Sequence, residues 1–350
     1  MIKFAVLGCG RIGRMHAINL ARHPRAELAW VFDVAGGAAA AVAEATGARQ
    51  ARDADEALAA KDVDAVLIAS STNTHLDLLE RAVEAGKAVL CEKPIDLDLA
   101  KVDACWQRIK QRNATIMTGF NRRFDPSFRA LRDRVLQGEI GKLEQLVITS
   151  RDPSPPPVAY IQVSGGMFRD MTIHDFDMAQ HIMGEDFVTV SAEASALTDP
   201  AIAGIGDIDT AVVTMRTASG KIAVITNSRR ASFGYDQRVE AHGALGTLRT
   251  ENVPANMSVL ETADGVRRSK PLFFFVERYA QSYKNEWAHF VDVLKGKESP
   301  SATGEHGRKA LALAEAAYIS LKSGRRVAVD EVFDKKSQMA AAEQEMPGLQ

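Results

Sequence analysis

Residues 3–13, KFAVLGCGRIG, place a GxGxxG motif between an apolar, strand-like run and a segment with the pattern of a helix. In such a unit Gly8 allows a tight turn, Gly10 lets the backbone approach a pyrophosphate, and Gly13 lets the helix pack on the strand. A glycine turn that binds no ligand is the alternative. The order of strand, motif and helix nevertheless predicts dinucleotide binding.

The residues that follow the motif indicate which dinucleotide binds. Arg11 and Ile12 begin the helix whose N-terminal end faces the phosphates. Asp33 ends the next apolar run, ELAWVFD, about 20 residues after the motif, where a carboxylate accepts hydrogen bonds from ribose hydroxyls and repels a 2′-phosphate. Val34 and Ala35 come next, with no adjacent Arg or Lys. The sequence therefore predicts NAD rather than NADP as the cofactor.

Short apolar runs alternate with helix-length segments from Lys3 to about Ser150. The runs KFAVLG, ELAWVFD, AVLIAS, AVLCEK and TIMTGF are continuously apolar, which is typical of a parallel sheet covered by helices on both faces. We therefore expect an N-terminal α/β domain with a doubly wound, Rossmann-type parallel sheet, and we place it at residues 1–122.

The pattern changes in the second half of the chain. After the Pro-rich residues 153–157 comes one helical segment, about 167–182, and then a series of alternating runs. Two further helical segments, about 276–295 and 306–322, precede the strand-like RVAVDEV. Alternation of this kind is typical of antiparallel strands with one buried face. The runs are VTVSAEASAL, TAVVTMRTA, KIAVITNSRR, QRVEAHGALGTLRT and MSVLETA.

We expect residues 123–333 to form an α+β domain that binds substrate on a large open, mostly antiparallel sheet, and residues 334–350 to form a flexible tail. An open sheet leaves one face to be covered, and two such faces packed together would bury it. The sequence thus favours a homodimer or homotetramer assembled through the C-terminal sheet.

Composition excludes several classes of function. The 350 residues carry a net charge of −2, so no basic surface suggests a nucleic-acid partner. Cys9, Cys91 and Cys105 form no CxxC pair, which argues for reduced thiols and against a zinc site. No apolar run reaches the roughly 20 residues of a membrane span, and no export signal is visible. We expect a soluble cytoplasmic protein without a metal.

Polar residues follow the run AVLIAS at the carboxyl end of a predicted strand. Open α/β sheets bind ligands at this edge, so Ser70, Asn73 and His75 are candidates for the nicotinamide half of the cofactor. Ser, Thr and Asn also favour the position just before a helix, and an N-cap role is the alternative.

Glu92, Lys93 and Pro94 end the next predicted strand at the same edge. The proline biases Lys93 toward an extended conformation. An ammonium here can bind a substrate hydroxyl and stabilise the charge that develops on oxygen as a hydride leaves the carbon. We therefore assign Glu92 and Lys93 to the cofactor edge and Lys93 to catalysis.

Asp170 and His174 are four residues apart in GGMFRDMTIHDFD, residues 165–177. On a helix both side chains share one face. A histidine is a natural proton acceptor for alcohol oxidation near neutral pH. The same spacing also occurs in metal sites and on solvated helix faces, but no third metal ligand is evident nearby.

With these motifs in this order, the chain resembles the Gfo/Idh/MocA oxidoreductases over nearly its whole length. The segments EKP and DMTIHDFD carry the resemblance more specifically than the glycine motif. It implies that His174 takes the hydroxyl proton, that Lys93 polarises the same oxygen, and that Asp170 holds substrate hydroxyls while hydride passes to nicotinamide. The segment from Ser150 to Asp170 is most similar to the inositol 2-dehydrogenase branch of the family.

The resemblance also makes Arg123, Asp152 and Tyr235 candidate substrate contacts. For Arg122 and Arg123 the alternative is a solvated or ion-paired cap, and Tyr235 could instead pack in the sheet. The expected reaction is oxidation of myo-inositol to 2-keto-myo-inositol (scyllo-inosose). The alternatives are another cyclitol or sugar (scyllo-inositol, D-chiro-inositol or an aldose) and, in a different class, a non-catalytic NAD-binding sensor.

Overall fold

The computed structural model describes residues 1–333, and the tail expected at 334–350 lies outside this range. The chain divides into two compact units. Unit 1 comprises Met1–Asp125 and Gln281–Lys309, and unit 2 comprises Pro126–Ala280 and the described residues from Ala310 onward.

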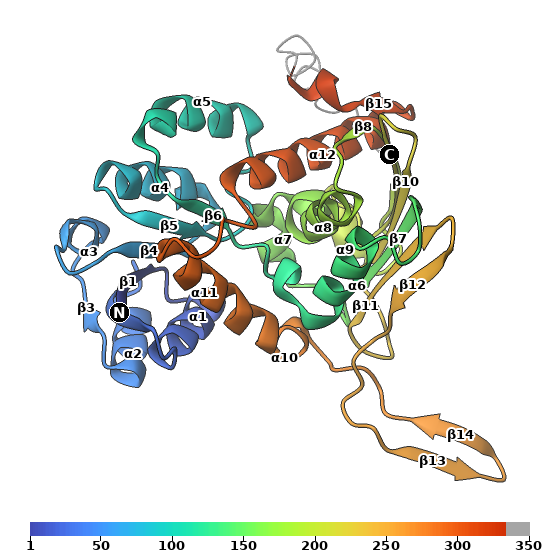
Figure 1. Cartoon of the computed structure of the whole chain (residues 1–350), viewed down its shortest axis with the longest axis horizontal. Coiled ribbons are helices and arrows are strands. Elements are labelled where there is room, and N and C mark those ends of the chain that lie inside the picture. The colour runs from blue at the N-terminus through green and yellow to red at the C-terminus, as the bar shows by residue number, and fades with distance from the viewer. Residues whose placement is uncertain (334–350) are drawn as a thin grey trace. The chain divides into compact units, whose positions relative to one another are not determined.

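Unit 1 is built on a six-stranded, all-parallel sheet in the order β3-β2-β1-β4-β5-β6. Figure 1 shows α1 and α2 on one side of this sheet and α4 and α5 on the other, which confirms the predicted doubly wound fold. The strands are β1 (Ile2–Leu7), β2 (Ala26–Phe32), β3 (Arg49–Gln50), β4 (Ala65–Ile68), β5 (Ala88–Cys91) and β6 (Ile116–Thr118). The helices are α1 (Arg11–Ala21), α2 (Gly36–Thr46), α3 (Ala54–Ala59), α4 (His75–Glu84) and α5 (Leu99–Ile109), with 3-10 turns at Thr72–Thr74, Lys110–Arg112 and Asn121–Phe124.

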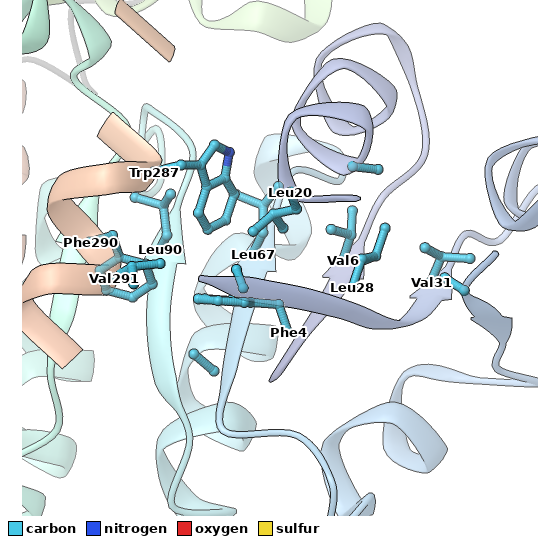
Figure 2. Close-up of a cluster of buried hydrophobic side chains, with 14 of the residues drawn as sticks. Phe4, Val6, Leu20, Leu28, Val31, Leu67, Leu90, Trp287, Phe290 and Val291 are labelled. Atoms are coloured by element: carbon cyan, nitrogen blue, oxygen red, sulfur yellow. The ribbon is translucent and has the colours of Figure 1, made fainter. Parts of the chain in front are cut away.

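The core of unit 1 includes a helix from far along the chain. In α11 (Ala280–Leu294) Trp287 is fully buried, and its ring meets Phe4 of β1 edge to face at 5.3 Å between centroids. Figure 2 shows Trp287, Phe290 and Val291 of α11 in the same cluster as Phe4 and side chains of α1, β4 and β5. The sequence predicted a single domain boundary near residue 122 and did not predict that α11 packs in unit 1. That packing depends on aromatic contacts between distant residues and not on a local pattern.

Unit 2 contains a seven-stranded mixed sheet in the order β12-β11-β7-β10-β9-β8-β15. Every neighbouring pair is antiparallel except β7 and β10, so the predicted open, mostly antiparallel sheet is confirmed. The strand β7, which lies inside the sheet, was not among the predicted runs, and the predicted run 237–250 is a hairpin of two strands. The strands are β7 (Leu143–Arg151), β8 (Phe187–Ser195), β9 (Thr210–Thr217), β10 (Ile222–Ser228), β11 (Asp236–Gly243), β12 (Gly246–Thr250) and β15 (Val327–Ala328).

Helices cover one face of this sheet, with α8 against β7 and α6 against β11 and β12. On the opposite face β9 and β10 expose Val212 and Ile222, while the alternating neighbours Val213 and Ala223 are fully buried. The helices are α6 (Pro126–Leu136), α7 (Val158–Ser164), α8 (Ile173–Met183), α9 (Pro200–Gly204) and α10 (Phe275–Arg278); α12 spans Gly304–Ser323, and Val329–Phe333 is a 3-10 segment.

Two segments of unit 2 differ from expectation. The predicted helix at 167–182 begins as a π-helical turn, Phe168–Thr172, which then continues into α8. The run MSVLETA does not join the large sheet, because β13 (Val259–Thr262) pairs only with β14 (Gly265–Arg268) in a separate two-stranded hairpin that projects from unit 2 (Figure 1). Among residues 1–333 no helix combines the length and apolarity needed to span a membrane.

Candidate active site

The glycine turn of unit 1 is shaped by three different requirements. Gly8 has a φ of +102°, and a Cβ there would collide with the backbone of Ala69 and Ser70. A Cβ on Gly13 would collide with the Gly8 carbonyl, so α1 packs against the turn only with glycine at that position. A Cβ on Gly10 would meet no atom within 4 Å. Gly8 and Gly13 are therefore required by packing, whereas Gly10 leaves open space at the start of α1.

That open space lies where a phosphate group would bind. Helix α1 begins at Arg11, and no side chain caps its first turn. The first N–H groups of an uncapped helix attract anions. Ile12 is half-buried and Arg11 is exposed. The predicted pyrophosphate site is thus open and lined by donors.

Asp33 is held at the turn by two backbone donors. Its carboxylate accepts hydrogen bonds from the N–H of Cys9 at 2.6 Å and from the N–H of Ala35 at 2.7 Å. Carboxylate oxygens can each accept more than one hydrogen bond, so capacity remains for ribose hydroxyls. Burial and the neighbouring Asp33 raise the pKa of Cys9 to about 11, so this thiol stays protonated at neutral pH.

The Ser70–His75 segment connects β4 to α4 at the edge of the sheet and includes the 3-10 turn Thr72–Thr74. Ser70 Oγ lies 2.6 Å from Thr74 Oγ1, and neither Ser71 nor Thr74 makes a side-chain cap to the helical turn it precedes. His75 is buried, with Nδ1 2.8 Å from the Pro94 carbonyl and Nε2 3.1 Å from the Ser70 carbonyl. Burial lowers the pKa of His75. Its ring therefore lies between the carbonyls that follow β4 and β5, and the neutral imidazole can donate to only one of them, while Asn73 is exposed.

Glu92 and Lys93 follow β5 at the same edge of the sheet. Glu92 N–H donates to the Ile68 carbonyl at 2.9 Å, and Glu92 Oε2 accepts from the Lys93 N–H at 3.2 Å. Its other oxygen, Oε1, lies 3.0 Å from Nε2 of His16 on α1. Burial alone would raise the pKa of Glu92, but the His16 hydrogen bond and the Lys93 charge outweigh it and lower the pKa. The carboxylate is therefore ionised beside Lys93.

All of these unit 1 residues lie at one edge. Because β2, β1, β4 and β5 are adjacent and parallel, the segments after their carboxyl ends meet there. Arg123 follows β6, the next strand of the same parallel sheet, and is only 4% exposed. It donates from Nη1 to the Ser301 carbonyl, so it is not a solvated cap.

Two of the predicted residues, Asp152 and Tyr235, lie at one end of the sheet of unit 2. Asp152 follows β7, and its N–H donates to the Ser228 carbonyl at the end of β10 at 2.9 Å. Tyr235 directly precedes β11, which pairs with β7 through Asp236 and Arg151. The Tyr235 ring is 5% exposed and meets Tyr279 edge to face at 5.9 Å, so most of this side chain packs in unit 2.

Asp170 lies in the π-helical turn at the same end of the sheet. Its Oδ1 accepts a hydrogen bond from the Tyr160 hydroxyl at 2.9 Å, and its Oδ2 lies 3.8 Å from Nη2 of Arg229, the residue after β10. The same Arg229 nitrogen lies 3.8 Å from Asp207. Arg229 is fully buried, so it acts on Asp170 from inside the protein. Two neighbours thus orient the Asp170 carboxylate.

His174 lies in the first turn of α8, between two residues anchored to β10. Thr172 Oγ1 donates to Asn227 Oδ1 at 2.7 Å, and Asn227 Nδ2 donates to Asp175 Oδ2 at 2.8 Å. Asn227 is only 3% exposed. One amide side chain therefore bonds to the side chains of residues on both sides of His174 in the sequence.

Sequence reasoning missed four residues that support the site: His16, Tyr160, Asn227 and Arg229. A signal for the last two was present, because both follow the apolar run KIAVIT at a strand end, as Lys93 follows its own strand. His16 and Tyr160 carry no local signal, since their partners are defined only by the fold.

Comparison with known proteins agrees with this arrangement. The family model described as an oxidoreductase family with an NAD-binding Rossmann fold matches residues 2–120, and the GFO/IDH/MocA C-terminal domain model matches residues 128–249. The chain is 47% identical to the inositol 2-dehydrogenase of Rhizobium meliloti (strain 1021) over 328 residues, which cover 94% of this chain and 99% of that protein. It is also 47% identical to the myo-inositol 2-dehydrogenase of Thermotoga maritima over 333 residues, covering 95% and 100% of the two chains.

A solved structure extends the comparison to a bound complex. The crystal structure of scyllo-inositol dehydrogenase from Lactobacillus casei with bound cofactor NAD(H) and scyllo-inositol has a TM-score of 0.87 at 30% identity, covering 94% of this chain and 99% of that one. Both halves of the family match, and near full-length relatives share almost half of the residues. The chain therefore belongs to the Gfo/Idh/MocA family of NAD-binding oxidoreductases.

Proposed function

We propose that this chain oxidises the axial hydroxyl of myo-inositol to 2-keto-myo-inositol (scyllo-inosose) with NAD. The observation that carries the proposal is the near full-length similarity to two inositol 2-dehydrogenases. Oxidation of a polyol requires a proton acceptor and a fixed hydrogen-bond acceptor, and His174 and Asp170 would supply them. Asn227 and Arg229 support the segment that carries both residues.

The residues of unit 1 fit a bound NAD. The open space at Gly10, the uncapped start of α1 with Arg11 and Ile12, and the Asp33 carboxylate match the needs of a pyrophosphate and an adenosine ribose. Gly8 and Gly13 shape that turn, and Ser70, Asn73 and Glu92 would line the nicotinamide end with Lys93. His75 would contribute from its buried place between the Ser70 and Pro94 carbonyls. When bound, NAD supplies the acceptor for the hydride.

The protein's own groups would manage the proton and the hydroxyls. His174 takes the proton from the reacting hydroxyl as the C–H bond donates its hydride. The Lys93 ammonium stabilises the negative charge that develops on that oxygen. Asp170 accepts hydrogen bonds from neighbouring hydroxyls, and Asp152, Arg123 and Tyr235 are further candidate contacts. The products balance as ketone, NADH and one proton.

The choice between cyclitols depends on hydroxyl orientation. A site built to hydrogen-bond a hydroxyl rejects the epimer that leaves a buried polar group unpaired. The sequence identity is 47% to the two inositol 2-dehydrogenases and 30% to the scyllo-inositol enzyme, which favours myo-inositol over scyllo-inositol. D-chiro-inositol and an aldose are the remaining alternatives.

We further propose that residues 1–122 serve NAD binding and residues 123–333 serve substrate binding and assembly. The exposed Val212 and Ile222 support assembly of a homotetramer or homodimer through the open sheet face. Reduced cysteines support a cytoplasmic location.

The decisive experiment is NADH formation at 340 nm with NAD or NADP and a panel of myo-, scyllo- and D-chiro-inositol and glucose. We expect turnover with NAD and myo-inositol that is lost in Lys93→Ala and His174→Ala. If NAD binds but no polyol is oxidised, the inositol proposal is wrong and a sensor role becomes the better explanation.

A further inference from the structure

A buried chain of three side chains connects α11, α1 and the residue before Lys93. The indole N–H of Trp287 donates to Nδ1 of His16 at 2.9 Å, and Nε2 of His16 lies 3.0 Å from Glu92 Oε1. His16 and Trp287 are both fully buried. All three residues belong to unit 1.

This geometry fixes where the His16 proton lies. An indole nitrogen can only donate, so Nδ1 of His16 must accept. The proton of the neutral imidazole is therefore on Nε2, where it donates to the Glu92 carboxylate. Trp287 and Glu92 select the same tautomer, so the His16 ring is held as a hydrogen-bond donor to Glu92.

Glu92 connects His16 to the backbone of Lys93 through hydrogen bonds. Its Oε1 accepts from His16, and its Oε2 accepts from the Lys93 backbone N–H at 3.2 Å. The carboxylate also lies against Gly119 of the next strand end, where a Cβ would sit 3.0 Å from it. A carboxylate held on three sides cannot rotate without releasing the Lys93 backbone.

We infer that His16 is a positioning residue for Lys93, acting through Glu92, with Trp287 fixing its tautomer. The inference rests on the proposed function only in giving Lys93 a catalytic role. Its geometric content, that His16 controls the placement of Lys93, is independent of the substrate.

A substrate-free experiment tests the geometric content. The rate of acetylation of Lys93 by acetic anhydride, followed by peptide mass spectrometry, is compared with that of the exposed Lys61 in the same sample. We expect the Lys93 rate to change severalfold in His16→Phe, which keeps a ring but removes the donor, while the Lys61 rate stays constant. His16→Gln retains an N–H donor near the Nε2 position and should restore the wild-type Lys93 rate.

A kinetic experiment tests the catalytic content. In His16→Phe we expect kcat with myo-inositol to fall by about 10- to 100-fold, because small misplacements of a catalytic group have effects of this size. The dissociation constant for NAD should change by less than about twofold, and His16→Gln should recover most of kcat.

Trp287→Phe removes the indole N–H that fixes the His16 tautomer, but it leaves the His16 ring and its Glu92 hydrogen bond in place. Because Glu92 still favours the same tautomer, its effect on kcat should be smaller than that of His16→Phe. Trp30→Phe is the matched control, since it removes an indole N–H that donates to Asp62 at 3.2 Å elsewhere in unit 1. Unchanged Lys93 labelling in His16→Phe would overturn the inference. If Lys93 labelling changes in His16→Phe but the wild type oxidises no polyol, the positioning role of His16 is supported. Only the proposed function is then contradicted.

Discussion

The side-chain amide of Asn227 donates a 2.8 Å hydrogen bond to the buried carboxylate of Asp175, the residue directly after His174. Its amide oxygen accepts from Thr172 at 2.7 Å, two residues before His174. Strand β10 therefore holds the start of α8 through the buried Asn227, which bonds to residues before and after His174.

Asn227→Asp should separate this clamp from simple packing. The substitution keeps the shape of the side chain but places a second carboxylate against Asp175, so the lost hydrogen bond should lower the free energy of unfolding by about 1–3 kcal/mol. We expect kcat to fall more than KM rises, because His174 loses its alignment. Urea unfolding and steady-state kinetics measure both effects. The exposed Asn256→Asp is the matched control, and equal behaviour of the two variants would contradict the role of Asn227.

Arg229 and Arg230 are neighbours in sequence with opposite surroundings. Arg229 is fully buried between Asp170 and Asp207, and among residues 1–333 its Nε and Nη2 have no hydrogen-bond partner. Burial, with the nearby Asp170 charge, raises the pKa of Asp207 despite the opposing effect of Arg229. Arg229 Nη2 therefore lies 3.8 Å from both carboxylates and places a buried positive charge between them.

Arg229→Met should therefore be costly and Arg230→Met should not. Removing one partner of a buried ion pair leaves an uncompensated charge, for which we expect a loss of about 3 kcal/mol in unfolding free energy. Asp170 would also lose an orienting partner, so kcat/KM for the polyol should fall while the NAD dissociation constant stays unchanged. Thermal unfolding and substrate titration test this pair. A similar small effect at both positions would show that Arg229 does not orient Asp170.

The contrast between local and distant contacts explains what the sequence could predict. The strand, glycine turn and helix at 3–13 are contiguous, so their pattern predicted the parallel sheet and the NAD edge. Lys93 was proposed as a catalytic residue because it follows an apolar strand. The His16 contact with Trp287 joins residues 271 positions apart, and no local pattern encodes it.

Two details of unit 2 could not be predicted from local patterns. The segment predicted at about 167–182 is helical, but its π-helical turn at Phe168–Thr172 depends on i→i+5 hydrogen bonds that apolar periodicity does not reveal. The alternating run MSVLETA predicts a strand but not its partner, and β13 pairs in a separate hairpin. Contacts with the rest of the fold determine both the π-helical turn and the pairing of β13.

Gly10 and Gly13 should respond differently to the same substitution. Gly10 has φ −65° and ψ −167°, which alanine readily adopts, and a Cβ there meets nothing within 4 Å. Gly10→Ala should therefore keep the melting temperature but weaken NAD binding about tenfold or more, because the methyl group occupies the space for the pyrophosphate. Gly13→Ala should lower the unfolding free energy by about 1–3 kcal/mol, because its Cβ collides with the Gly8 carbonyl.

Calorimetric melting and titration of NAD into each variant distinguish these two effects. Gly37→Ala in α2 is the control, since a Cβ at that position also meets nothing within 4 Å, and it should bind NAD normally. Wild-type NAD affinity in Gly10→Ala would show that the pyrophosphate does not approach this turn.

Glu286 should make the protein less stable as pH rises. It is fully buried, and neither carboxyl oxygen has a hydrogen-bond partner within the described part of the chain. Burial, followed by the charge of Glu92, raises its pKa well above the ordinary value of 4.5. Above pH 4.5 the unfolded chain releases this proton while the folded protein retains it, so the unfolded state binds fewer protons and the free energy of unfolding falls with increasing pH.

Glu286→Gln removes this titration while it keeps a neutral side chain of the same shape. The difference in unfolding free energy between Glu286→Gln and the wild type should therefore increase in favour of the variant from pH 5 to pH 8, as measured by urea unfolding at each pH. Glu44→Gln, on the exposed side of α2, should give a constant difference. A pH-independent difference for Glu286→Gln would mean that Glu286 is ionised in the folded protein. The neutral form is expected because an ionised Glu286 would add a second buried negative charge beside Glu92, the carboxylate that holds the backbone of Lys93.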